Sequence, residues 1–252
     1  MKVTLYFSMA VLCGLQAYAG TGPGPMEKYR SNSNACVILL HGLGRTSRSM
    51  AGMAAAMTAA GYLAVNLDYP SRQKPIEELA DAVVPKGIER CREATVGRID
   101  FITHSMGGIV LRSYLARHDI AELGRVVMLS PPNQGSEASD RLMNNRVYRW
   151  YNGPAGQQLG TGPEGMAASL GPVDYQTGII TGNRHSFFDG WLADIIPGQD
   201  DGKVSVERAR VAGMADFMVL PYAHSFIMQQ KEVMAQTLHF LQTGVFDHGI
   251  QP

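Results

Sequence analysis

Continuous runs of apolar residues recur along the chain, and a turn closes each of them. The first three cover Ala35–Leu40, 62–67 and 126–130 and are rich in valine, isoleucine and leucine. An unbroken apolar run of this length is typical of a strand that is buried on both faces, as in a parallel sheet. Three further strands are expected over 98–103, Thr177–Gly182 and Asp216–Leu220.

Helical patterns fill the gaps between these runs. A methionine-rich stripe over 50–60 follows Thr46 and Ser47, either of which can cap a helix. A second stripe begins at residue 76 and contains Pro85, which predicts a kink. Two more helices are expected over 109–117 and 226–242. Because strands and helices alternate, the sequence predicts an α/β fold: a mostly parallel sheet of about six strands with helices on both faces.

The stretch 136–171 breaks this alternation. It is rich in glycine and shows neither the period of a strand nor that of a helix. Long irregular stretches inside a compact domain are usually functional. We expect an insertion of one or two short helices and a long loop, which covers the carboxyl edge of the sheet as a cap or lid.

The first 19 residues differ in composition from the rest. Lys2 precedes an apolar run over 3–15, and Ala17, Tyr18 and Ala19 match a small-x-small cleavage site. This pattern predicts a signal peptide over 1–19 and an exported protein, periplasmic or secreted. An uncleaved anchor and a buried strand are the alternatives. Residues 20–252 are expected to form a single domain.

Charge and cysteine content limit the possible binding partners and the cellular compartment of the protein. Lys+Arg and Asp+Glu number 22 each, so total charge gives no support for binding to nucleic acid or to an anionic membrane. No stable membrane insertion is expected. Cys36 and Cys91 remain after signal removal, and a pair of cysteines in an exported chain predicts a disulfide. Both are expected near the amino-terminal edge of the sheet, and two buried free thiols are the alternative.

The candidate chemistry begins at Ser105. A β-rich run, 98–103, meets small residues around Ser105, and a helical run follows directly. A serine on a sharp turn between strand and helix is the usual setting of a hydrolase nucleophile. Residues that flank the turn must pass close together, which suits Gly107 and limits the size of Thr103.

A serine nucleophile requires a base, and the base requires a partner that orients it. Of the seven histidines, His224 directly follows the last expected strand near the end of the chain. The acid is expected between Ser105 and His224, after a strand. Asp201 is favoured over Asp200 because Gly202 permits a sharp turn behind it. Asp174, Asp189 and Asp194 are less well placed.

Two backbone amides are candidate donors to an oxyanion. Met106 follows the nucleophile at a helix amino terminus. Leu43 lies in the turn after the first strand, where Gly42 permits close approach. No H-x-x-x-H motif or Cys/His cluster supports a metal site, and no cofactor is expected.

These motifs give the chain a resemblance to bacterial α/β-hydrolases of the lipase/esterase type. The motifs are 41–44 (HGLG), 103–108 (THSMGG), 201–204 (DGKV) and the loop at His224. The resemblance implies Ser105 as nucleophile, Asp201 as acid, His224 as base, and Leu43 and Met106 as oxyanion donors. Thr103 departs from the usual G-x-S-x-G elbow, but lipase-like relatives accept threonine there.

The resemblance implies a serine hydrolase that cleaves a small-molecule or lipid ester through an acyl-enzyme. Thioesterase or acyltransferase chemistry on the same triad is an alternative, because a fold does not fix a substrate. A non-catalytic homologue that binds a lipid or a partner is another. The 136–171 insertion is expected to line or cover the acyl pocket with Met143, Tyr148, Trp150, Tyr151, Leu159 and Met166.

Overall fold

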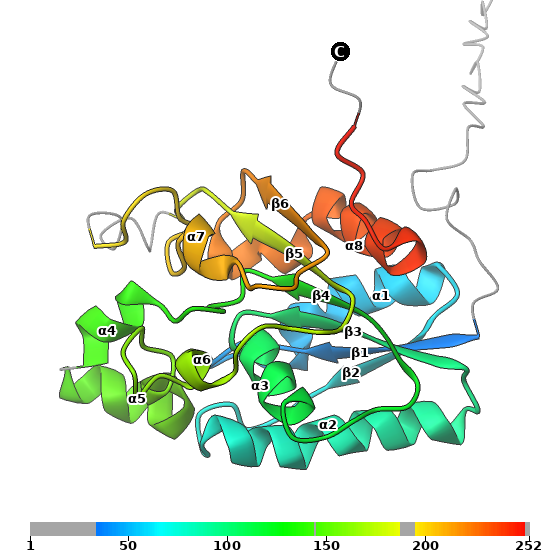
Figure 1. The fold of residues 1–252 in the computed structure, drawn as a ribbon, viewed down its shortest axis with the longest axis horizontal. Coiled ribbons are helices and arrows are strands. Elements are labelled where there is room, and N and C mark those ends of the chain that lie inside the picture. The colour runs from blue at the N-terminus through cyan, green and yellow to red at the C-terminus, as the bar shows by residue number, and fades with distance from the viewer. Residues whose placement is uncertain (1–33, 144, 187–194, 250–252) are drawn as a thin grey trace, which may run out of the picture.

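A six-stranded parallel sheet forms the centre of the protein (Figure 1). The computed structural model describes residues 34–143, 145–186 and 195–249. The predicted signal peptide and the candidates Asp189 and Asp194 lie outside these residues. The strand order is β2-β1-β3-β4-β5-β6. The strands are β1 (Ala35–Leu40), β2 (Leu63–Leu67), β3 (Arg98–His104), β4 (Leu123–Leu129), β5 (Thr177–Gly182) and β6 (Asp216–Leu220).

Helices cover both faces of this sheet, as the alternating pattern predicts. On one face α2 (Ile76–Glu93) and α3 (Met106–Leu115) pack against the β1 side chains of Ile38 and Leu40. On the other face α1 (Ala51–Ala59) and α8 (Lys231–Thr243) pack with Val37 and Leu39. Successive β1 residues therefore serve opposite cores, which explains why the run is apolar without alternation.

The strand over 62–67 differs from the prediction. We expected a strand buried on both faces, but the Leu63 side chain is 40% exposed, and Ala64 and Asn66 are only half-buried. The reason is that β2 pairs only with β1 and forms an edge of the sheet. An apolar run alone does not distinguish an edge strand from a central one.

Two helices also depart from the expected pattern. A short 3-10 helix, η2 (Ser47–Met50), precedes α1, and Thr46 makes no capping hydrogen bond there. The Ser47 amide instead donates to Asp68 Oδ1 at 2.8 Å, from the loop after β2. Helix α2 continues from Ile76 to Glu93 with Pro85 inside it. A Cβ atom at Gly87 would lie 2.9 Å from side-chain atoms of Ile38, so this glycine lets α2 pack closely on the sheet.

Cys36 and Cys91 form the predicted disulfide, which joins β1 to the last turn of α2. Their Cα atoms are 5.7 Å apart, and both residues are fully buried. The bridge closes a loop with a sequence separation of 55 residues. Because such a loop restricts the unfolded chain, it stabilises the fold by about 4 kcal/mol in the chain-entropy account.

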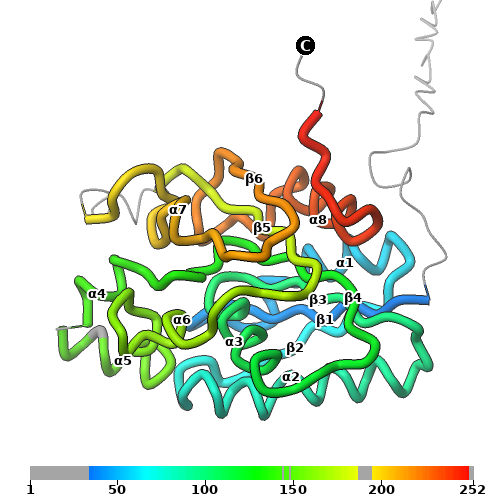
Figure 2. Tube along the Cα trace, in the orientation of Figure 1, coloured from blue at the N-terminus to red at the C-terminus, as the bar shows by residue number. Residues whose placement is uncertain are grey.

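The 136–171 segment contains three helices, where the sequence predicted one or two. They are α4 (Glu137–Met143), α5 (Arg146–Gln157) and α6 (Met166–Ser169), and α5 is broken at Gly153, which has a φ of 64°. The segment lies at the end of the molecule toward which the strands point (Figures 1 and 2). Its position at the carboxyl edge of the sheet agrees with the prediction.

The remaining short helices, α7 (Val206–Ala209) and η4 (His224–Gln229), precede β6 and α8 respectively. Across the part of the chain that the structure describes, no helix has both the length and the apolar character needed to cross a bilayer.

Candidate active site

Ser105 lies on a strained turn between β3 and α3. Its φ of 52° and ψ of −124° belong to a region that non-glycine residues rarely occupy. A Cβ atom at Gly107 would lie 2.6 Å from the Leu40 carbonyl oxygen, so α3 can start this close to β1 only with glycine there. We expected Thr103 to be the residue that leaves no room for a side chain at position 107. The backbone of β1 is what leaves no room there. The Thr103 hydroxyl faces Gly108 instead, where a Cβ would lie 3.2 Å away.

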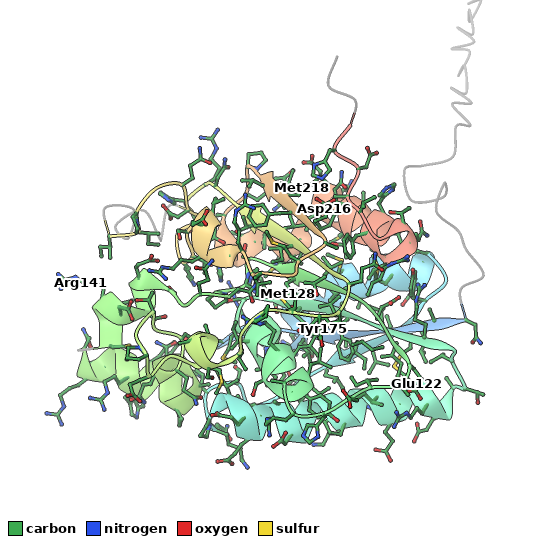
Figure 3. All side chains as sticks on the ribbon, viewed as in Figure 1. Glu122, Met128, Arg141, Tyr175, Asp216 and Met218 are labelled. Atoms are coloured by element: carbon green, nitrogen blue, oxygen red, sulfur yellow. A yellow bond between two sulfur atoms is a disulfide. The ribbon has the colours of Figure 1, made fainter. Side chains whose placement is uncertain are left out.

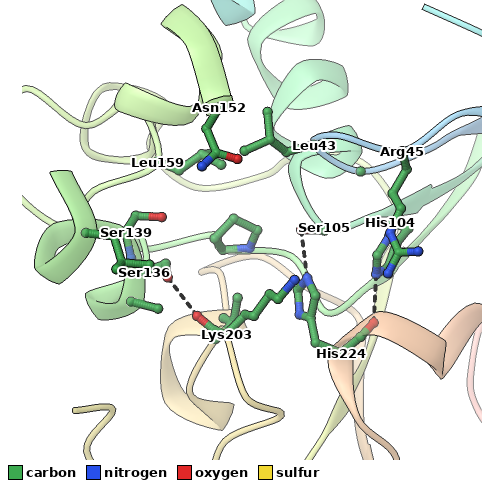
Figure 4. A pocket seen from close by; sticks show the side chains of 15 residues that line it. Leu43, Arg45, His104, Ser105, Ser136, Ser139, Asn152, Leu159, Lys203 and His224 are labelled. Atoms are coloured by element: carbon green, nitrogen blue, oxygen red, sulfur yellow. Dashed lines mark hydrogen bonds between the residues drawn. The ribbon is translucent and has the colours of Figure 1, made fainter. Parts of the chain in front are cut away.

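Three predicted residues form a chain of hydrogen bonds at the carboxyl edge of the sheet. Ser105 Oγ lies 2.9 Å from His224 Nε2, and His224 Nδ1 lies 2.8 Å from Asp201 Oδ2 (Figure 4 shows the first contact). An ionised carboxylate only accepts hydrogen bonds, so His224 donates from Nδ1 and keeps Nε2 as the acceptor. The arrangement can remove a proton from the Ser105 hydroxyl.

The Asp201 carboxylate is held in place by its own loop. Its Oδ1 atom accepts hydrogen bonds from the amides of Lys203 at 3.1 Å and Val204 at 2.9 Å. The His224 amide also donates to the Asp201 carbonyl at 2.9 Å. Burial acts to raise the pKa of Asp201, but the charge and hydrogen bond of His224, with the Val204 amide, hold that pKa below its ordinary value. Asp201 therefore stays ionised.

Asp200 has a different set of partners. Its Oδ1 atom accepts from the Gly202 amide at 2.7 Å and lies 2.7 Å from His185 Nε2. The side chain is nearly fully buried and closes the turn that carries Asp201. The geometry supports the expectation that one aspartate faces His224 while its neighbour braces the loop.

The turn over 41–44 approaches Ser105 closely. A Cβ atom at Gly42 would lie 3.1 Å from Ser105 Cβ, and Leu43 lines the same cavity as Ser105. Met106 is the first residue of α3, where an amide has no acceptor within the helix. The two candidate oxyanion donors thus lie on opposite sides of Ser105 in the sequence and beside it in space.

His41 and Tyr69 support this turn, a pairing that we did not predict. The rings stack with centroids 4.1 Å apart. The Tyr69 hydroxyl donates to the His41 carbonyl at 2.5 Å, and the Tyr69 amide donates to His41 Nε2 at 3.3 Å. Burial lowers the pKa of His41, so the ring is neutral and acts as an acceptor at Nε2. The contact joins the turns after β1 and β2, which no local sequence pattern reveals.

His104 is a second contributor that the sequence did not identify. Its Nε2 atom donates to the His224 carbonyl at 3.0 Å, and its ring lies in the wall of the cavity (Figure 4). Burial, followed by the charge of His224, holds the pKa of His104 well below its ordinary value. A neutral His104 therefore fixes the backbone that carries His224.

A cavity of about 140 Å³ lies above Ser105 and His224. The 136–171 segment supplies part of its wall through Ala138, Ser139, Leu142, Asn152 and Leu159. Of the expected lining residues whose side chains the structure describes, only Leu159 is among those that form it. The side chains of Trp150 and Tyr151 lie on the exposed side of α5 and border a separate groove. Met166 is buried in the core, and the side chain of Tyr148 is not described.

Solved structures of bacterial enzymes resemble this chain over most of its length. Lipase BlEst2 of Bacillus licheniformis matches 82% of this chain and 91% of its own, with a TM-score of 0.62 and 21% identity. Phospholipase PlaB of Legionella pneumophila matches 84% of this chain and 60% of its own, with a TM-score of 0.67 and 17% identity. The chain has the α/β-hydrolase fold.

A thermophilic esterase from Thermogutta terrifontis shares this α/β-hydrolase fold at 14% identity, over 84% of this chain and 91% of its own, with a TM-score of 0.55. No protein-family model and no curated protein matches the sequence. In α/β-hydrolases the nucleophile, acid and base follow in the chain order Ser, Asp or Glu, His. Ser105, Asp201 and His224 have that order and the corresponding contacts.

Proposed function

We propose that the protein is a serine hydrolase that cleaves carboxylic esters through an acyl-enzyme. The observation that carries the proposal is the hydrogen-bonded chain from Ser105 through His224 to Asp201, with Ser105 held at a φ of 52°. A strained serine beside an oriented histidine is preorganised for nucleophilic attack. The α/β-hydrolase fold of lipases and esterases supports the same assignment.

Each residue has a defined step. Ser105 Oγ attacks the ester carbonyl while His224 Nε2 takes the hydroxyl proton. The tetrahedral intermediate collapses, the alkoxide leaves with that proton from His224, and an acyl-Ser105 ester remains. Water then attacks the acyl group, with His224 as base, and releases the carboxylic acid. Asp201 accepts the hydrogen bond from His224 Nδ1 and stabilises the imidazolium of His224 that forms during both acylation and deacylation.

The amides of Leu43 and Met106 are the proposed donors to the oxyanion of both intermediates. Preorganised backbone donors at this position stabilise the developing charge by about 3 kcal/mol each. The stacked pair of His41 and Tyr69 fixes the backbone that carries Leu43. The start of α3 fixes Met106.

Labelling with a fluorophosphonate probe tests the proposal. The wild-type protein should react covalently, and Ser105→Ala should not. Ser113, a buried serine of the helix that follows Ser105, offers a matched control, and Ser113→Ala should retain the label. No labelling of the folded wild type would favour a non-catalytic protein that binds a lipid or a partner. Equal labelling of Ser105→Ala would mean that another residue reacts and would overturn the proposal that Ser105 is the nucleophile.

A panel of acyl donors separates the remaining alternatives. Esters should be hydrolysed faster than matched thioesters, and water should outcompete added alcohols as acceptor. A preference for thioesters, or transfer to alcohols in excess of hydrolysis, would assign thioesterase or acyltransferase activity to the same residues.

We also propose that the protein is exported after removal of residues 1–19. The disulfide between Cys36 and Cys91 supports an oxidising compartment, because such bonds are rare in the reducing cytosol. Mass analysis of the protein from culture fluid and periplasm should find a chain that begins at Gly20. A chain that retains Met1 to Ala19 would contradict cleavage.

A further inference from the structure

The first part of α5 presents an unusual group of side chains to solvent. Val147 is 72% exposed, Trp150 is 83% exposed and Tyr151 is 54% exposed. Large apolar residues that gather on one exposed surface usually mark a site of interaction. The Asn145 side chain caps this helix by accepting from the Val147 amide at 2.9 Å, so the surface belongs to an ordered element.

Three exposed arginines lie close to these apolar side chains in the sequence. Arg141, Arg146 and Arg149 are all exposed, and the sequence from 141 to 163 contains no aspartate or glutamate. Figure 3 shows Arg141 projecting outward at this end of the molecule. The whole chain is electrically neutral, so the total charge conceals a local excess of three positive charges.

The two acidic residues of the preceding helix, α4, are already bound to partners other than these arginines. Glu137 forms an ion pair with Arg208 of α7. Asp140 accepts hydrogen bonds from the amide and the hydroxyl of Thr161, at 2.9 and 2.6 Å. Both carboxylates therefore already have partners, while the three arginines face solvent.

The body of the protein holds this part of α5 in place. The Arg72 guanidinium lies 4.5 Å from the centroid of the Tyr151 ring and donates to the Tyr151 carbonyl at 3.2 Å. The backbone of Gly153 packs directly on the Arg72 carbonyl. Asn152, which lies between Tyr151 and Gly153, lines the cavity above Ser105. The exposed side of α5 and the wall of the cavity are thus two sides of one anchored helix.

We propose that Val147, Trp150, Tyr151, Arg141, Arg146 and Arg149, here called the α5 surface, dock the protein on membranes that carry anionic lipid headgroups. A short helix that combines aromatic residues with arginines and lacks acids suits the boundary between headgroups and acyl chains. Tryptophan and tyrosine favour that depth because their rings are apolar with one polar group. The arginines meet lipid phosphates, and no segment crosses the bilayer.

This inference does not depend on the proposed hydrolase activity, and it revises the expectation from total charge. A protein partner with an acidic, apolar surface is the competing occupant. The lipid surface is favoured because Arg146 and Arg149 lie on the same helix as the aromatic residues, and Arg141 lies on the helix before it, so that all three can meet a layer of phosphates. A protein partner remains an outcome of the test.

Vesicle binding by Ser105→Ala tests the proposal without hydrolysis of the lipid. The protein should sediment with vesicles of phosphatidylcholine mixed with phosphatidylglycerol, weakly with phosphatidylcholine alone, and less as salt rises. Replacing Arg141, Arg146 and Arg149 together by glutamine should weaken binding to the anionic vesicles by about 100-fold. Trp150→Ala should weaken binding by about tenfold. The control variants Arg90→Gln and Val245→Ala, at exposed sites elsewhere, should leave binding to anionic and to neutral vesicles unchanged.

Tryptophan fluorescence gives an independent readout. The chain has two tryptophans, Trp150 and Trp191, so Trp191→Phe leaves Trp150 as the sole reporter. Its emission should shift to shorter wavelength on anionic vesicles. An unchanged emission, or equal binding to neutral and anionic vesicles, would overturn the proposal. So would self-association or capture of a protein through Trp150 without vesicle binding. Fluorophosphonate labelling reports the activity separately.

Discussion

The carboxyl edge of the sheet and the 136–171 segment above it are built in different ways. At the edge, Ser105 and the loop of His224 follow strands whose positions in the sheet are fixed by backbone pairing: Leu40 aligns with Thr103, and Gly182 aligns with Leu220. Asp201 lies farther from β5 in the sequence, and amides of its own loop hold its carboxylate. The segment above is held by individual side-chain contacts. Ser136 donates to the Lys203 carbonyl at 2.7 Å, and Gln158 joins the start of α2.

This difference separates chemistry from selectivity. Regular pairing places Ser105 and His224 with little freedom, and backbone amides fix Asp201 beside His224. The residues of α4 and α5 that line the cavity depend on a few contacts. Substitutions at the edge should therefore abolish activity, and substitutions in the segment should change which substrates are used. The following experiments test that division, in decreasing order of expected effect.

Asp201→Asn should lower kcat by about 10⁴-fold, because the amide leaves His224 in the wrong tautomer. Asp200→Asn is a matched control from the same loop and should lower kcat by less than about tenfold. Steady-state kinetics on a soluble ester measures both. The reverse ranking would assign the acid to Asp200 and contradict the contacts of His224.

His104→Ala should lower kcat by roughly 30-fold while KM changes little, because the His224 backbone loses its donor. His104→Gln, which can place an N–H near the same carbonyl, should recover part of that loss. Thermal unfolding of both variants separates the effects. If kcat well below Tm equals that of wild type, then His104 serves stability alone.

Leu159→Ala should change the preference between long and short acyl chains by about tenfold, because it enlarges the cavity. The rate on an acetate ester should stay within about twofold. Leu170→Ala, a partly buried leucine near the end of the same segment, is the control. A uniform loss on all esters in Leu159→Ala would place this residue with the catalytic edge.

Acid should destabilise the wild type more steeply than Asp201→Asn. The pKa of Asp201 lies below its ordinary value in the folded protein. Its stabilising contribution is therefore complete above about pH 4 and is lost as the pH falls through the folded pKa. Denaturant unfolding between neutral pH and about pH 3 measures the slopes. Parallel slopes would mean that Asp201 gains no stabilisation from His224.

The same division explains what the sequence could predict. The strands, the turn at Ser105 and the disulfide follow from local patterns and from the fact that parallel strands end at one edge. The preference for Asp201 rested on Gly202, whose φ of 97° agrees with that argument. These features could be predicted because they follow general rules of α/β sheets.

The remaining features depend on contacts between distant residues. The stack of His41 on Tyr69 and the bond from His104 to the His224 carbonyl join separate loops. Aromatic residues of α5 were expected in the pocket because they are large and apolar. Trp150 and Tyr151 face outward, since Gly153 breaks α5 and Arg72 fixes its direction. Composition could not reveal that direction.

The covalent bond between Cys36 and Cys91 gives the first part of the fold the topology of a closed ring. That ring contains the turn of Gly42 and Leu43, Tyr69, and the anchor Arg72. A protease that cuts a loop inside it leaves both fragments attached, so the cut chain keeps its full mass until a reductant is added. A single cleavage inside this ring therefore need not release the turn of Gly42 and Leu43 from the rest of the site.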